Sequence, residues 1–281
     1  MKKKSMKLLI AAVVATMSIG VLTGCGSKEN NGSDNASKNV TISISGSTSM
    51  GKLMEKEAES YKGKNQNVSI EIQQIGSSAG IKNVISGVSE IGMASRELKD
   101  EEKSQVKETT IAYDGIALIT NPKNGVENLT MEDIKNIYTG QVTNWKELGG
   151  KDSPIVVVSR EDGSGTRDAF GEIVGFKAEE LIKEATISDG NGAVKTTVAG
   201  NENAIGYISF EHIDETVKAL KVEGVEATPD KVLDKSYKLS RPFLVVSKEG
   251  KLTEEGQKFI DYILSEEGQK IVEETGGIKI K

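Results

Sequence analysis

The residues of this chain with the clearest chemistry are Arg160-Glu161-Asp162-Gly163-Ser164-Gly165-Thr166. They follow an apolar, β-branched run from Pro154 to Ser159 and precede a segment with helical character. A strand that turns on glycine into a helix directs unpaired backbone N–H groups at one point, and here two hydroxyls and a guanidinium accompany them. This is the chemistry of an oxyanion-binding pocket.

Two other segments have the same arrangement. Val40 to Ile44 leads into Gly46-Ser47-Thr48-Ser49, and Val68 to Ile75 leads into Gly76-Ser77-Ser78-Ala79-Gly80. Ligands of α/β folds lie at the carboxyl ends of strands, where all three loops are expected. Three loops of one type predict one shared anionic ligand.

The elements that must position these loops alternate along the chain. Besides the strands before the loops, the pattern predicts strands at 91–94, 111–120, 186–188, 204–209 and 243–247, and helices at 50–61, 81–86, 131–138, 167–174, 253–264 and 267–274. Strands separated by helices predict an α/β fold with mostly parallel sheets.

The first 25 residues resemble a secretion signal. Lys2, Lys3, Lys4 and Lys7 precede an interrupted apolar stretch from Leu8 to Val21, which is too short for a comfortable membrane span. Leu22-Thr23-Gly24-Cys25 is similar to the lipobox of bacterial lipoproteins, which implies cleavage before Cys25 and a lipid on its sulfur. Because Cys25 is the single cysteine, disulfides and CxxC metal sites are excluded.

Residues 25–39, which follow this signal, are predicted to form a flexible tether, because Ser27 to Asn39 contains no large apolar residue. About 240 residues follow, enough for two ordinary domains. Without residues 1–24 the chain has 32 basic and 42 acidic residues, a net charge of −10. This negative net charge argues against nucleic acid as a partner. If the protein binds an anion, the attraction must come locally from the loops.

Six short motifs in one order resemble a known family. They are the three loops above, Ile91-Gly92-Met93-Ala94-Ser95-Arg96, Thr143-Asn144-Trp145 with Leu148-Gly149-Gly150, and Ala204-Ile205-Gly206-Tyr207. They are similar to the phosphate-binding lipoproteins of ABC-type phosphate uptake. The resemblance implies a two-lobed, type II periplasmic-binding-protein fold with a two-stranded hinge and the ligand between the lobes. One lobe would comprise residues 40–118 plus 242–281, and the other residues 119–241.

The resemblance also implies roles for individual residues. Thr48, Ser49 and Ser77 match positions that hold phosphate oxygens, and Ser164, Gly165 and Thr166 match donors at a helix N-terminus. Arg160 matches the guanidinium that pairs with phosphate, and Asp162 the carboxylate that orients it. The family implies neither a cofactor nor a metal.

The chain departs from the family at Arg96, where some members carry aspartate. A fixed carboxylate accepts the proton that phosphate keeps near neutral pH, and sulfate, which has no proton, leaves it unpaired. Asp114 in Tyr113-Asp114-Gly115, at a strand break, is the predicted substitute. Without any such acceptor the same loops would suit sulfate.

Two alternatives involve chemistry rather than binding. Gly46 to Lys52 nearly matches a Walker A loop, but Leu53 stands where the Mg²⁺ ligand belongs. Gly76 to Gly80 fits a GxSxG nucleophile elbow, so Ser78 with the single histidine, His212, could form a lipoprotein hydrolase. His212 has polar neighbours and is expected at the surface.

The sequence therefore favours an extracytoplasmic, lipid-anchored receptor, not an enzyme. It would capture inorganic phosphate, act as a monomer and deliver the ligand to a membrane-embedded ABC permease. The alternatives left open are the Ser78/His212 hydrolase and a receptor of the same fold for sulfate or another tetrahedral oxyanion.

Overall fold

The computed structural model of this chain describes residues 39–280. The predicted signal peptide, Cys25 and the tether up to residue 38 lie outside the described residues. Within residues 39–280, no helix is both long enough and apolar enough to span a bilayer.

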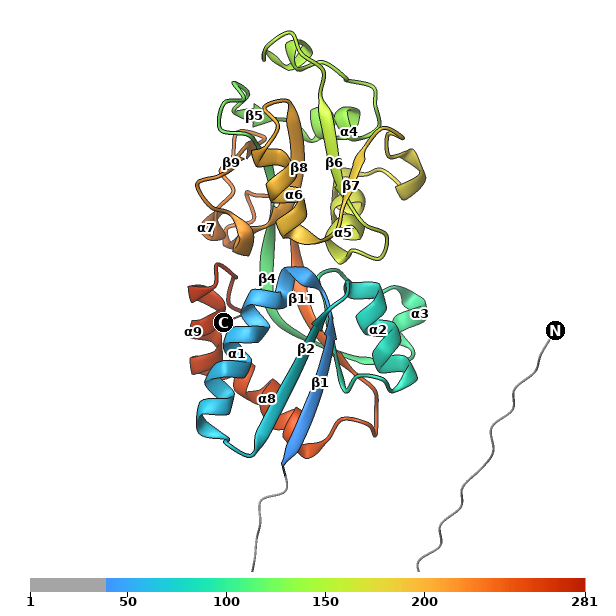
Figure 1. Ribbon diagram of the computed structural model, residues 1–281, viewed down its shortest axis with the longest axis vertical. Helices are drawn as coiled ribbons and strands as arrows, with labels where there is room; N and C mark the ends of the chain where they lie inside the picture. The colour runs from blue at the N-terminus through green and yellow to red at the C-terminus, as the bar shows by residue number, and fades with distance from the viewer. Residues whose placement is uncertain (1–38, 281) are drawn as a thin grey trace, which may run out of the picture. The chain divides into compact units, whose positions relative to one another are not determined.

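Figure 1 shows how strands and helices alternate along the chain. The strands are β1 (Val40–Gly46), β2 (Val68–Gln74), β3 (Ile91–Ala94), β4 (Lys107–Thr120), β5 (Asn128–Leu129), β6 (Val156–Arg160), β7 (Thr186–Ser188), β8 (Ala204–Ser209), β9 (Lys218–Ala219), β10 (Lys221–Val222) and β11 (Ser240–Ser247). The α-helices are α1 (Gly51–Lys64), α2 (Ser77–Ser86), α3 (Asp100–Lys103), α4 (Met131–Tyr138), α5 (Gly165–Val174), α6 (Gly190–Ala199), α7 (Pro229–Leu233), α8 (Glu254–Ile263) and α9 (Glu266–Glu274). The 3₁₀ helices are η1 (Thr48–Met50), η2 (Trp145–Leu148), η3 (Ala178–Glu180) and η4 (Phe210–His212).

The principal sheet has the strand order β2-β1-β3-β11-β4-β8-β6-β7. Pairing is parallel within β2-β1-β3 and within β8-β6-β7, as the alternating pattern predicts. Between these groups β11 and β4 pair antiparallel with each other and with their neighbours, so the sheet is mixed rather than mostly parallel. β4 pairs with β11 through residues 107–115 and with β8 through residues 116–120, so one strand belongs to both halves of the sheet.

The buried apolar residues fall into separate cores. One, the middle-segment core, is built from residues between Ile116 and Leu239. The others, the end-segment cores, combine residues 42–112 with residues from Phe243 onward. Between residues 39 and 280, the chain passes from one core to another only within β4 and at the start of β11. This crossover supports the predicted lobe limits near residues 118 and 242, which remain a proposal.

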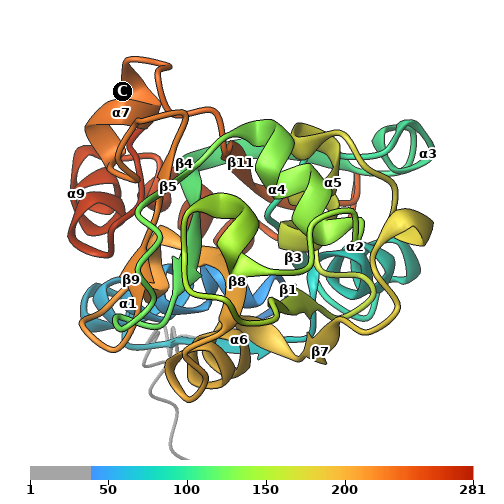
Figure 2. The same ribbon diagram turned by 90° about the horizontal axis from the view of Figure 1, so that it is seen from above.

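The end-segment cores lie on opposite faces of the sheet because side chains alternate along a strand. On β11, Phe243 and Val245 join the core formed with α1, α8 and α9, whereas Leu244 and Val246 join the core formed with α2. Figure 1 shows these helices on either side of β1 and β2. In the other half, Figure 2 shows α4 and α6 on opposite sides of β8.

Aromatic packing holds the middle-segment core together. Phe170 of α5 stacks on Tyr207 of β8 with ring centroids 4.0 Å apart, and Tyr138 of α4 meets Phe170 edge-on at 4.8 Å. Trp145 is buried there and donates its indole N–H to the Asn203 carbonyl at 2.9 Å. Trp145 therefore packs within its half of the chain.

The helix α1 buries one charged residue in its apolar face. Glu57 is 0% exposed among Leu53, Met54 and Tyr61, and neither carboxyl oxygen has a hydrogen-bond partner among the described residues. Burial, and secondarily the negative charge of Glu267, raises the pKa of Glu57 to about 9. A raised pKa in the folded state contributes stability at low pH that is lost as pH rises toward that pKa.

We expect Glu57→Met to stabilise the protein increasingly with pH. Between pH 5 and pH 8 the unfolded wild type releases a proton that the folded state retains, which costs the wild type on the order of 3 kcal/mol. Urea unfolding at both pH values measures the difference, with Glu59→Met on the exposed face of α1 as the control. A stability gain that is equal at both pH values would contradict the prediction.

Candidate functional site

The three loops singled out in the sequence each connect a strand end to a helix start. β1 leads into η1 and α1, β2 into α2, and β6 into α5. A fourth connection of this kind, from β7 into α6, was not predicted from the sequence. Each helix start presents backbone N–H groups without intrahelical partners, which favours negative charge at that point.

Direct contacts join the loops of the two halves. Ser49 Oγ lies 2.8 Å from Thr166 Oγ1, Arg160 Nη2 donates to Thr48 Oγ1 at 3.0 Å, and the Ser78 N–H donates to the Gly163 carbonyl at 3.1 Å. Ser49, Ser77, Arg160, Ser164 and Thr166 are all buried, and Thr48 is half-buried. The structure thus brings together the predicted donor residues of all three loops.

The close approach of these loops requires glycine at residue 165. A Cβ atom there would lie 2.3 Å from Ser77 Oγ and 2.8 Å from Ser95 Oγ, well inside van der Waals contact. Ser164, one residue earlier, caps α5 by accepting a hydrogen bond from the Arg167 N–H at 3.3 Å. The first turn of α5 therefore packs directly against the side chains of Ser77, at the start of α2, and Ser95, after β3.

Arg160 is the charged group of the site and is 1% exposed. Its Nε and Nη2 donate to both oxygens of Glu161, at 2.8 and 2.7 Å, a bidentate pair. Its Nη1 is buried and has no hydrogen-bond partner within residues 39–280. The fixed guanidinium therefore keeps one buried donor free for a ligand.

The carboxylate that orients Arg160 is Glu161, so the sequence prediction of Asp162 was wrong. Asp162 lies in the turn after β6, is 96% exposed and pairs with Arg167. Burial raises the pKa of Glu161, but hydrogen bonds from Arg160 and the charge of Arg160, aided by the Gly190 N–H, outweigh it and lower the pKa overall. Glu161 is thus held as an anion that neutralises Arg160.

Two serines that the sequence analysis did not assign complete the floor of the site. Ser47 Oγ accepts from the Ser49 N–H at 3.1 Å and donates to Ser95 Oγ at 2.9 Å. The Ser95 N–H in turn donates to Ser77 Oγ at 3.1 Å. Ser95 follows the buried strand β3 directly, the same strand-end position that marked the other loops.

Asn191, in the first turn of α6, is a third residue that the sequence analysis missed. Its Nδ2 lies 3.0 Å from Ser49 Oγ and 3.4 Å from Thr48 Oγ1, so it reaches across to the opposite half. The segment Gly190-Asn191-Gly192 consists of poor helix formers, and four β-branched residues follow before Ala199. Nothing in that pattern predicted a helix, and without the helix its first turn was not considered.

Asp114 is completely buried, with 0% exposure, at a position where β4 pairs with β11. Its Oδ2 lies 2.7 Å from Arg241 Nη2, and its Oδ1 accepts from Ser209 Oγ at 2.9 Å and the Phe210 N–H at 3.2 Å. Burial raises the pKa of Asp114 to about 6, although Arg241 and Ser209 act in the opposite direction. These contacts give Asp114 a structural role, and its predicted contact with the ligand stays a prediction.

Arg96 connects the two halves beside the second ligand loop. Its guanidinium makes a bidentate pair with Glu102 at 2.7 and 2.9 Å and donates to Ser78 Oγ at 3.2 Å. Its Nε lies 3.0 Å from Asp168 Oδ2 in α5, a charge contact without hydrogen-bond alignment. At the position where some family members carry aspartate, this chain therefore has an interlobe bridge.

The hydrolase alternative requires a hydrogen bond between Ser78 and His212. The structure gives each of these residues other contacts. Ser78 Oγ accepts from Arg96, and no hydrogen bond joins it to His212 among the described residues. His212 is half-buried rather than exposed, contrary to the sequence prediction, because η4 packs toward Thr48. Burial, reinforced by the charge of Lys195, lowers the pKa of His212 to about 4.

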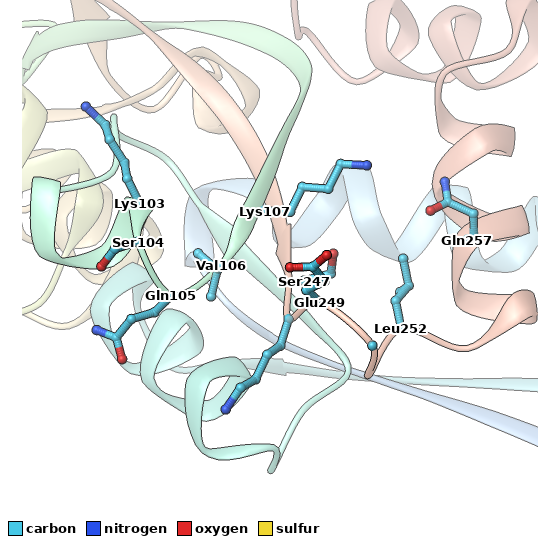
Figure 3. A pocket seen from close by; sticks show the side chains of 11 residues that line it. Lys103, Ser104, Gln105, Val106, Lys107, Ser247, Glu249, Leu252 and Gln257 are labelled. Atoms are coloured by element: carbon cyan, nitrogen blue, oxygen red, sulfur yellow. The ribbon is translucent and has the colours of Figure 1, made fainter.

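Other features of residues 39–280 are separate from these loops. A surface hollow of about 500 Å³ is lined by residues at the start of β4, the end of β11 and the start of α8, and Figure 3 shows Lys103, Lys107 and Gln257 around it. None of the predicted binding residues lines this hollow. No cluster of histidine, cysteine or carboxylate side chains suited to a metal ion occurs in the described part of the chain.

Comparison with known proteins identifies the family. Residues 30–267 match the family model described as the PBP superfamily domain. The chain is 32% identical to the phosphate-binding protein PstS of Bacillus subtilis over 289 aligned positions, which cover 100% of this chain and 95% of the relative.

Solved structures show the same relationship. A Clostridium perfringens protein, described as a substrate-binding protein of a phosphate ABC transporter with phosphate bound, is 68% identical with a TM-score of 0.85, covering 86% of this chain and 100% of that one. An ABC-type phosphate transport receptor from Vibrio cholerae is 38% identical with a TM-score of 0.73, covering 84% and 99%. These matches confirm the predicted α/β, periplasmic-binding-protein-like fold, and the chain belongs to the PBP superfamily, alongside the PstS phosphate-binding proteins.

Proposed function

We propose that this chain is an extracytoplasmic receptor that binds inorganic phosphate and delivers it to the permease of an ABC transporter. The observation that carries the proposal is the buried Nη1 of Arg160, which has no partner within residues 39–280. A buried charged donor without an acceptor costs free energy. An oxyanion that enters among the hydroxyls and helix N-termini around Arg160 supplies the missing acceptor.

The relatives support phosphate as that oxyanion. The Clostridium perfringens protein, which is 68% identical to this chain, is described with phosphate bound. The Bacillus subtilis relative is named a phosphate-binding protein and aligns with the whole chain. Such proteins are transport receptors rather than enzymes, so no bond is made or broken at the site.

The location of the receptor is part of the same proposal. Leu22-Thr23-Gly24-Cys25 supports a lipid on Cys25 that anchors the protein to the outer face of the cell membrane. The tether after Cys25 would let a monomer reach its permease while staying at that surface.

We expect Arg160→Ala to weaken phosphate binding by about 2 kcal/mol or more, because it removes the charged partner of a buried anion. Arg160→Lys should restore only part of the affinity, since a lysine cannot make the same bidentate contacts. Calorimetric titration with phosphate measures both, with Lys146→Ala at an exposed position as the control. Unchanged affinity of Arg160→Ala would remove Arg160 from the site.

A second prediction separates the structural role of Asp114 from a role as proton acceptor. We expect Asp114→Asn to lower the free energy of unfolding by about 3 kcal/mol, because Arg241 loses the charged partner of a buried pair. The ratio of phosphate to sulfate affinity should stay unchanged. Ser209→Ala, which removes a neutral partner of Asp114, is the matched control.

Competition titrations with phosphate and sulfate, together with urea unfolding, measure the two effects of Asp114→Asn. If sulfate binding rises relative to phosphate binding, Asp114 accepts the ligand proton, as the sequence analysis predicted. That result would also mean that the contacts with Arg241 and Ser209 do not occupy the carboxylate fully.

A third prediction concerns closure. Thr48, Ser49 and Ser77 on one side and Arg160 and Thr166 on the other satisfy one small anion only when the two halves meet. Phosphate should therefore compact the wild type in small-angle X-ray scattering and raise its melting temperature by mass action. Arg160→Ala should show neither change at the same phosphate concentration. Identical scattering of wild type with and without saturating phosphate would count against a hinged receptor.

A further inference from the structure

Hydrogen-bond donors contact the hydroxyl oxygens of the site. These donors determine the direction in which each hydroxyl proton points. Building on the proposed function, we propose that Asn191 is a positioning residue that fixes Thr48 and Ser49 as hydrogen-bond donors toward the anion. The oxygen of the ligand that meets these two residues is then a deprotonated one. The protonated oxygen of monohydrogen phosphate points elsewhere in the site.

The orientation of the Asn191 amide follows from its other contact. Asn191 is 1% exposed, and its Oδ1 lies 3.1 Å from the backbone nitrogen of Ser209. A backbone N–H only donates, so the atom that faces it must be the carbonyl oxygen of the amide. The NH₂ group of Asn191 is therefore the part that faces Thr48 and Ser49.

Thr48 receives two such hydrogen bonds. Arg160 Nη2 donates to Thr48 Oγ1 at 3.0 Å, and Asn191 Nδ2 approaches the same oxygen at 3.4 Å. A hydroxyl has two lone pairs and one proton. With both lone pairs engaged by obligate donors, Thr48 offers only its proton to anything that enters the site.

Ser49 Oγ has two close neighbours in the site. Asn191 Nδ2 donates to it at 3.0 Å, and Thr166 Oγ1 lies 2.8 Å away. Asn191 fills one lone pair of Ser49, and a hydrogen bond from Thr166 fills the other. With both lone pairs engaged, the Ser49 proton is the group directed outward.

The serines Ser47, Ser77 and Ser95 of the site are also oriented by hydrogen bonds to one another. Ser95 Oγ accepts from Ser47 Oγ, and Ser77 Oγ accepts from the Ser95 N–H. Hydroxyls that are oriented before the ligand arrives need not reorganise when it binds, which is the general source of affinity from preorganisation. Asn191 supplies this orientation to the two hydroxyls of the first loop.

A double-mutant cycle with inorganic phosphate tests the inference. We expect Asn191→Ala to weaken phosphate binding about tenfold in the wild-type background and much less in a Ser49→Ala background, because contacting residues couple. Asn201→Ala, at the other end of α6, should bind phosphate like the wild type. Thermal melting without ligand checks that each variant is folded.

The outcomes of this cycle are separable from those of the proposed function. If Asn191→Ala weakens binding equally in both backgrounds, Asn191 acts through Ser209 or α6, and the positioning role is overturned. If Asn191→Ala binds phosphate as tightly as the wild type, the role is also overturned. If the wild type itself shows no binding of phosphate, the proposed function fails rather than this inference.

Discussion

The buried guanidinium of Arg160 is the constraint on which the rest of the site depends. A cation in that position needs a fixed counter-charge, and Glu161 provides it through two hydrogen bonds. Because Glu161 also accepts from the Gly190 N–H, the same carboxylate fixes the start of α6 beside the guanidinium. Nη1 of Arg160, which has no partner in the part of the chain that the structure describes, then defines where a ligand oxygen belongs.

Two strands of the sheet connect the halves of this arrangement. Each half is a parallel group of strands whose carboxyl ends and helix starts face the ligand position, but within residues 39–280 only β4 and β11 continue from one core to the other. Asp114 and Arg241 are paired where these two strands lie side by side, and Asp114 also holds the start of η4. This buried ion pair therefore joins β4 and β11 at the passage between the cores.

Much of the architecture was predictable because strand ends, glycine turns and helix starts leave a local pattern in the sequence. The three loops follow from such patterns, and the family resemblance supplied the donors on the loops. The contacts of Asp114 with Arg241, of Arg96 with Ser78 and of His212 with Thr48 join residues more than 15 positions apart, and no local pattern encodes them. Asn191 was missed because the poor helix formers around it conceal the start of α6. Glu161 was missed because only the direction of its side chain distinguishes it from Asp162.

The bridge made by Arg96 lies beside the second ligand loop, where Arg96 also contacts Ser78. Glu102 and Asp168 hold this arginine between the halves, so part of the energy that keeps the halves together does not come from contacts with a ligand. The apparent affinity of a receptor falls with the fraction of molecules that are not already competent to bind. Ionic strength, which screens partly exposed charge pairs such as Arg96 with Asp168, therefore changes ligand retention without altering one contact to the ligand. Substitutions in this bridge can therefore adjust the affinity of such a receptor while the residues that contact the ligand stay the same.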